Sequence, residues 1–131
     1  MPWRAPTAIE SLSTREPVRD RERLQHILDA INTIQHSRAK YSTPEEVNDP
    51  IIYYGFVKHV EIIGEAVYML SKELREANPE VEWESIEGMR HVLVHGYYQI
   101  EPDQLWDTVD KDIPLLKPQI EKILGENFRA Q

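Results

Sequence analysis

The chain has 131 residues, a length typical of one domain, and it carries a formal net charge of −8 and no cysteine. The absence of cysteine excludes disulfides and cysteine-based zinc sites. The acidity excludes tight binding of polyanions over a broad surface, so contact with a nucleic acid must be local or helped by a partner. No apolar run approaches the ~20 residues that a membrane-spanning helix needs. The N-terminal residues also lack the apolar core of a signal peptide, and we expect a soluble, cytoplasmic protein.

The first 19 residues contain three prolines and no periodic apolar pattern, which predicts a flexible tail before a helical domain over residues 20–131. The first helix is expected from Asp20 to Lys40. Its apolar residues recur at intervals of three and four and form one stripe: Leu24, Ile27, Leu28, Ile31 and Ile34. Charged residues, Arg38 among them, are expected to face water. Pro44 then starts a short helix that ends near Asn48.

A second long helix is predicted from Pro50 to about Ala77, where Asn78 and Pro79 stop it. The third begins near Trp83, and Gly96 is expected to end it. The fourth opens at Pro102, and Pro114 and Pro118 predict a kink or a break within it. No segment alternates as a strand does. The sequence therefore predicts an all-α, four-to-five-helix, up-and-down bundle.

Two glycines, Gly55 and Gly64, lie inside the predicted second helix. Glycine in a helix interior costs about 0.5–1 kcal/mol relative to alanine, so a pair of them on one helix indicates close approach of another element. The alternative is that each is simply tolerated.

The segment GMRHVLVHGYY, residues 88–98, gathers one arginine, two histidines and two tyrosines at the predicted end of the third helix. A purely structural interpretation is available. Histidine near a helix C-terminus is favoured by the dipole, glycine is an ordinary stop, and tyrosines after a helix often cover the core.

A catalytic interpretation rests on Arg90 and His95. The dipole favours the protonated form of His95, which suits a general acid or base, and the planar fork of Arg90 suits a phosphate. Together they suffice for metal-free cleavage of RNA, whose 2′-hydroxyl is the nucleophile. The two residues lie about 140° apart around an ideal helix, so a second copy of the chain would make a composite cleft easier to build.

Two other chemistries are weaker. His91 and His95 have the four-residue spacing of a metal pair, with Glu65 as a possible further ligand, but there is no HExxH motif and no clear third ligand. Ser71 and Ser85 lack a glycine elbow or a histidine partner nearby in sequence, which argues against serine nucleophiles.

The run MRHVLVHGYY resembles the signature of the HEPN superfamily, an arginine followed by a histidine five residues later and a tyrosine two residues after that. More narrowly it resembles the HepT-like ribonuclease toxins, and the match falls on Arg90, His95 and Tyr97. The segments IIGEAV, NPEVEWESIEGMR and IEPDQLWDTVDKDIPLL are also similar, so the resemblance covers roughly residues 21–124. One departure is His91, where many HEPN nucleases have asparagine.

This resemblance implies a dimerising HEPN-type bundle that acts as a metal-independent endoribonuclease toxin, with Arg90 and His95 as catalytic residues and no cofactor. His91 and Glu65 would support the site. The implied partners are an RNA substrate, a second copy of the chain, and a minimal nucleotidyltransferase antitoxin that transfers AMP to Tyr97. Neither DNA nor a membrane is expected as a partner. The alternative is a non-catalytic HEPN subunit that binds or regulates a nucleotidyltransferase.

Overall fold

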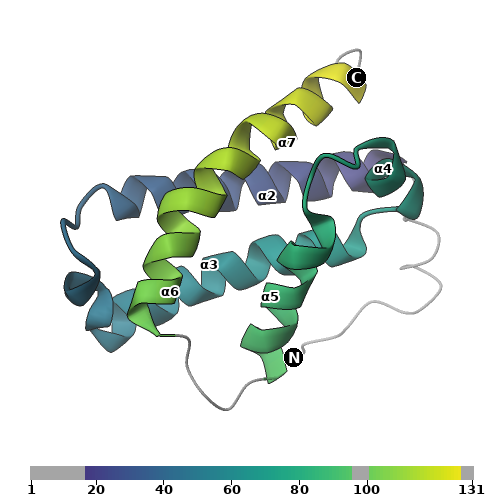
Figure 1. Cartoon of the computed structure of the whole chain (residues 1–131). Helices are drawn as coiled ribbons and strands as arrows, with labels where there is room; N and C mark the ends of the chain where they lie inside the picture. The colour runs from purple at the N-terminus through teal and green to yellow at the C-terminus, as the bar shows by residue number, and fades with distance from the viewer. Residues whose placement is uncertain (1–16, 96–100, 128–131) are drawn as a thin grey trace, which may run out of the picture.

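The structure is a computed structural model that describes residues 17–95 and 101–127 (Figure 1), and within these ranges it contains helices and no strand. The elements are α2 (Pro17–Arg38), η1 (Pro44–Asn48), α3 (Pro50–Met69), α4 (Lys72–Ala77), α5 (Trp83–His95), α6 (Pro102–Asp107), η2 (Thr108–Asp112) and α7 (Ile113–Asn127). Because α6, η2 and α7 follow one another without a gap, these ranges form four long helical segments and two short ones. The predicted all-α bundle is confirmed. No helix within these ranges has the length and apolar character to cross a membrane.

The core lies between α2, α3 and the α6–α7 segment. Figure 1 shows α2 and α3 side by side in opposite directions, with α7 packed against α2 and α5 packed against α3. The predicted stripe of α2 is buried except for the partly buried Leu28. The apolar stripe that the sequence predicts for the last segment is wholly buried: Leu105, Val109, Ile113, Leu116, Ile120 and Ile123. The predicted stripe of α5 (Ile86, Met89 and Leu93) is only partly buried. This difference arises because α5 packs mainly against one neighbour, α3.

The second predicted helix is in fact two helices, and the prediction of one helix from Pro50 to Ala77 is wrong. Leu70 and Ser71 have extended backbones between α3 and α4. The Ser71 hydroxyl accepts the N–H of Leu74 and so caps α4. The backbone N–H and the hydroxyl of Ser71 both donate to the carboxylate of Asp20, which is 5% exposed. This buried carboxylate on α2 thus fixes the break.

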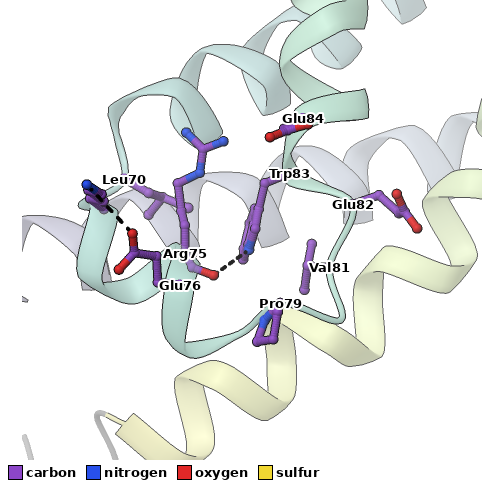
Figure 2. Close-up of a pocket in the computed structure, with 9 residues that line it drawn as sticks. Leu70, Arg75, Glu76, Pro79, Val81, Glu82, Trp83 and Glu84 are labelled. Atoms are coloured by element: carbon purple, nitrogen blue, oxygen red, sulfur yellow. Dashed lines mark hydrogen bonds and ion pairs between the residues drawn. The ribbon is translucent and has the colours of Figure 1, made fainter.

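The turn between α4 and α5 is organised by Trp83, as Figure 2 shows. Its indole ring is 5% exposed. The indole N–H donates to the backbone carbonyl of Arg75 at 3.2 Å, the bond drawn in Figure 2. It also donates to the backbone carbonyl of Asn78 at 2.9 Å. The indole therefore satisfies carbonyls at the end of α4 and buries its ring in the same place. This contact fixes the position from which α5 starts.

The last helical segment contains Pro114 and Pro118, the two predicted interruptions, and their effects on the helix differ. Residues Thr108–Asp112 form a π-helical turn in which the N–H of Ile113 bonds to the carbonyl of Thr108, five residues back. This wider turn directly precedes Pro114, whose ring would clash with a carbonyl in a regular α-helix. Figure 1 shows the segment changing direction between α6 and α7. Pro118, in contrast, lies inside α7 and does not end it.

Arg38 is at the last position of α2 and does not face water as predicted. Its guanidinium carbon lies 3.8 Å from the centroid of the Trp106 ring. One Nη pairs with Asp110 at 3.0 Å, and the other donates to the carbonyl of Tyr41 at 2.9 Å. Arg38 therefore ties the end of α2 to the α6–η2 segment.

The first helix begins earlier than predicted, at Pro17 and not at Asp20, so the predicted tail is shorter by three residues. Residues 1–16 lie outside the described ranges.

Candidate active site

Gly64 and Arg90 bring α3 and α5 into close contact. A Cβ placed on Gly64 would lie 2.3 Å from the Cβ and 3.3 Å from the Cα of Arg90. Only glycine lets the two helix backbones approach this closely. The expectation of a close approach is therefore confirmed for Gly64. It is not met at Gly55, where an added Cβ would have no atom within 4 Å.

The guanidinium of Arg90 is held by two side chains of α3. Its Nε donates to a carboxylate oxygen of Glu65 at 2.6 Å, and its central carbon lies 4.7 Å from the centroid of the Tyr68 ring. Glu65 and Tyr68 are three residues apart and so share one face of α3. The Arg90 side chain is 21% exposed and that of Glu65 is 52% exposed. The arginine thus lies at the surface in a fixed orientation.

Within the part of the chain that the structure describes, this arrangement leaves the anion-binding fork of Arg90 available. Glu65 engages Nε, whereas the two Nη groups carry four of the five N–H donors of a guanidinium. Such a fork matches a phosphate in two parallel hydrogen bonds. A carboxylate partner also orients the fork, because it fixes the rotation of the guanidinium plane. The site can therefore bind an oxyanion at a defined position beside α3.

Two more of the predicted site residues, His91 and His95, belong to the same helix. His95 is the last residue of α5 and lies about 7.5 Å along the helix axis from Arg90. His91 is exposed and directly follows Arg90. The side chain of His95 and the whole of residues 96–100, which include Tyr97 and the expected Gly96 stop, lie outside the described residues. The structure thus places Arg90, Glu65 and His91 and leaves the roles of His95 and Tyr97 as predictions.

Of the rival chemistries, the His91–His95 metal pair stays a prediction, because the side chain of His95 lies outside the described residues. No group of three or more histidine, aspartate or glutamate side chains in those ranges is arranged to hold a metal ion. The hydroxyl of Ser71 donates to the Asp20 carboxylate and caps α4, so it is committed to the fold. Ser85 lies at the edge of a groove and is exposed.

Among the residues that the structure describes, two hollows border α5, and Arg90 lines neither of them. The first, of about 570 Å³, is at the α4–α5 turn beside Trp83 and Arg75 (Figure 2). The second, of about 510 Å³, runs between α5 and α7 over Val60 and Ile63 of α3. Arg75 is paired with Glu87 and Trp83 is part of the turn, so these two residues of the first hollow serve the fold. Apolar side chains from three helices line most of the second.

Sequence reasoning identified Arg90 and named Glu65 as a supporting residue, but it missed Tyr68. The spacing could have indicated Tyr68, because this residue follows Glu65 by three positions and so lies on the same helix face. Gly64, directly before Glu65, marked the place where the facing helix comes close. The three together predict a contact point on α3, although not which residue of α5 meets it.

The fold and these contacts define a small helical protein in which a carboxylate and an aromatic ring hold an arginine at the surface. Residues 27–123 match the family described as Ribonuclease HepT-like, and the chain belongs to this family. It is 40% identical over 101 residues to a protein of Caldanaerobacter subterraneus subsp. tengcongensis named "Putative RNase", covering 77% of this chain and 90% of that protein. A protein of Methanocaldococcus jannaschii with the same designation is 33% identical over 98 residues, covering 75% of this chain and 90% of its own length.

A third relative, "Probable ribonuclease HepT" of Thermococcus cleftensis, is 31% identical over 100 residues, covering 76% of this chain and 91% of its own length. No solved structure gives a significant match. The resemblance to HepT-like ribonucleases noted in the sequence is therefore confirmed: the chain is a member of the Ribonuclease HepT-like family, and these relatives carry the names of ribonucleases.

Proposed function

We propose that the chain is the toxin of a toxin–antitoxin pair, a metal-independent endoribonuclease that uses Arg90 and His95. The observation that carries the proposal is the fixed guanidinium of Arg90, bonded through Nε to Glu65 with its Nη fork available for a phosphate. His95, at the end of the same helix, supplies the group that moves protons. The membership in the HepT-like ribonuclease family supports the same assignment.

The proposed cleavage of RNA needs no metal ion, because each bond that forms is matched by a bond that breaks. The 2′-oxygen of RNA loses its proton and bonds to the adjacent phosphorus, the bond from phosphorus to the 5′-oxygen breaks, and that oxygen gains a proton. The products are a 2′,3′-cyclic phosphate and a 5′-hydroxyl. Histidine accepts or returns the proton, while Arg90 stabilises the charge that builds on the phosphoryl oxygens.

A homodimer would bring two such sites to one cleft and provide a histidine from each copy. Two apolar side chains near the end of α5 support an interface there, because Val92 is 41% exposed and Val94 is 43% exposed. Sedimentation at micromolar concentration should give a dimer, and Val94→Asp should shift it toward monomer. If the wild-type chain sediments as a monomer, the proposal of a cleft shared by two copies is refuted.

The cleavage test uses purified, unmodified protein in EDTA. It should cut single-stranded RNA and leave cyclic phosphate ends. Arg90→Ala and His95→Ala should each lower the rate by at least about 100-fold, the usual scale for one acid–base or charge-stabilising group, with helical content unchanged. The matched controls are Arg21→Ala and His26→Ala, which replace exposed residues of the same types on α2. Full activity of either site variant would refute the assignment.

The neutralisation test concerns Tyr97. We propose that a minimal nucleotidyltransferase transfers AMP to its hydroxyl, so that the added phosphate occupies the Arg90 fork. Co-expression with the enzyme should add AMP units that mass spectrometry maps to Tyr97. Tyr97→Phe should keep nuclease activity and resist neutralisation, whereas the neighbouring control Tyr98→Phe should still be neutralised. AMP elsewhere, or silencing of Tyr97→Phe, would refute modification of this tyrosine.

The second candidate is a non-catalytic subunit that binds a nucleotidyltransferase. The observation that favours it is the Glu65 carboxylate on Arg90, which offsets the charge that would attract RNA in a chain already at −8. In that case the purified chain would form a complex with the nucleotidyltransferase and would not cut RNA at any concentration tested.

A further inference from the structure

We infer that Tyr68 is a nucleobase subsite beside the phosphate fork of Arg90, an inference that deepens the proposed function and rests on it. The ring lies 4.7 Å from the guanidinium carbon, and the residue is 55% exposed. The ligand class is a nucleotide whose base stacks on the ring while its phosphate meets Arg90.

The position of the ring fits this role. Arg90 covers one face of the tyrosine, and the high exposure of the residue shows that much of the remaining ring is open to water. In a polynucleotide the base and the phosphate belong to the same nucleotide. A ring in contact with a phosphate-binding guanidinium is therefore within reach of an adjacent base. The aromatic platform and the cation act on two parts of one ligand.

The negative charge of the protein makes a stacking contact between Tyr68 and a base important for binding RNA. The net charge of −8 disfavours binding through many phosphate contacts, because the field of the protein repels the RNA backbone. Stacking does not depend on charge, and one base on one aromatic ring changes affinity by about 5- to 150-fold. It also tolerates any base, because each has a π face. A single platform thus suits local contact with varied RNA.

The competing explanation is that Tyr68 only holds Arg90. A ring over a guanidinium stabilises it through a cation–π contact, and loss of that contact would misplace the fork. The two roles differ in their readout. A holding role predicts a fall in kcat, whereas a base platform predicts weaker binding of ligands that carry bases and unchanged binding of ligands that lack them.

The chain provides a matched control in Tyr54. It lies on α3, is 49% exposed, and is 14 residues before Tyr68, which is about 21 Å along the helix. Tyr54→Leu and Tyr68→Leu therefore make the same chemical change at similar exposure, one away from Arg90 and one beside it. Tyr68→Phe keeps the ring and removes only the hydroxyl.

The experiment compares two uncleavable probes of equal charge. One is a 2′-O-methyl oligoadenylate, and the other is an abasic oligomer with the same number of phosphates. The wild-type chain should bind the first about 5- to 150-fold more tightly. Tyr68→Leu should lose this preference, and Tyr68→Phe and Tyr54→Leu should keep it. If Tyr68→Leu keeps the preference, or the wild-type chain has none, the subsite is refuted.

A second arm uses cleavable RNA and separates this inference from the proposed nuclease activity. With Tyr68→Leu the KM should rise by a larger factor than kcat falls, because Glu65 still holds Nε of Arg90 when the ring is gone. A fall in kcat at unchanged KM would show that the ring only positions Arg90, which overturns the inference. No cleavage by the wild-type chain would refute the nuclease, while the binding arm would still decide the base subsite.

Discussion

Replacing Gly64 by alanine should separate α3 from α5 and move Arg90. The added Cβ would lie 2.3 Å from the Cβ of Arg90, whereas carbon atoms in contact are normally about 3.5–4.0 Å apart. The helices must therefore part locally by roughly 1.2–1.7 Å. Neither atom belongs to the flexible end of a side chain, so a change of rotamer cannot relieve the clash. The shift must fall on the backbone of α5.

The size of the effect follows from two opposing terms. Overpacking of this kind typically costs about 1–3 kcal/mol. Alanine is better than glycine in a helix interior by about 0.5–1 kcal/mol. The net loss of unfolding free energy should be on the order of 1 kcal/mol. The effect on activity should be larger, because a displacement of 1 Å at a reacting centre can lower the rate about 100-fold.

Gly55→Ala provides the control on the same helix. A Cβ at Gly55 meets no atom within 4 Å, so this variant gains the helix propensity without a clash and should be slightly more stable than the wild type. The two variants should differ by about 1–3 kcal/mol in urea unfolding, because the propensity term is common to both. RNA cleavage should fall only in Gly64→Ala. If Gly64→Ala matches Gly55→Ala in both stability and activity, the close packing at Arg90 is refuted.

Three further substitutions have defined outcomes. Trp83→Phe should lower stability by about 0.5–1.5 kcal/mol in thermal unfolding, because it removes the indole N–H bonds to two carbonyls, which keep only the backbone N–H groups of Asn78 and Val81 as donors. Ser71→Ala should cost about 1–2 kcal/mol, since it removes the cap of α4 and one of two bonds to the buried Asp20 carboxylate; a neutral result would refute the capping role. Glu65→Gln should change stability by less than about 1 kcal/mol because the pair is partly exposed. It should nevertheless alter cleavage, since the orientation of Arg90 depends on that carboxylate.

Much of the fold was predictable because the apolar spacing of α2 and of the α6–α7 segment reflects burial directly. The break at Leu70–Ser71 was not, because the residue that fixes it is Asp20, 51 positions earlier in the chain. Local pattern cannot reveal such a partner. Arg38 was misplaced for the same reason, since Trp106 and Asp110 lie far along the chain and make its burial favourable.

The candidate site was predictable in its residue types and not in its contacts. The resemblance to a known signature identified Arg90, and Glu65 stood in a similar segment. The link between them depends on where α5 meets α3, which is a property of helix packing. Tyr68 was missed because an exposed tyrosine on a helix has no pattern of its own. Only its distance to the guanidinium of Arg90, which the sequence does not show, marks Tyr68 as part of the site.

The position of α5 has a consequence for how the molecule comes apart. Its apolar residues are only partly buried and it packs mainly on α3, whereas α2, α3 and α7 share a buried core. Local opening follows the number of buried contacts, so the amides of α5 should exchange with solvent sooner than those of α2. Arg90 and His95 both belong to this helix. Under mild denaturant the molecule should therefore lose its site while most of its helical structure persists.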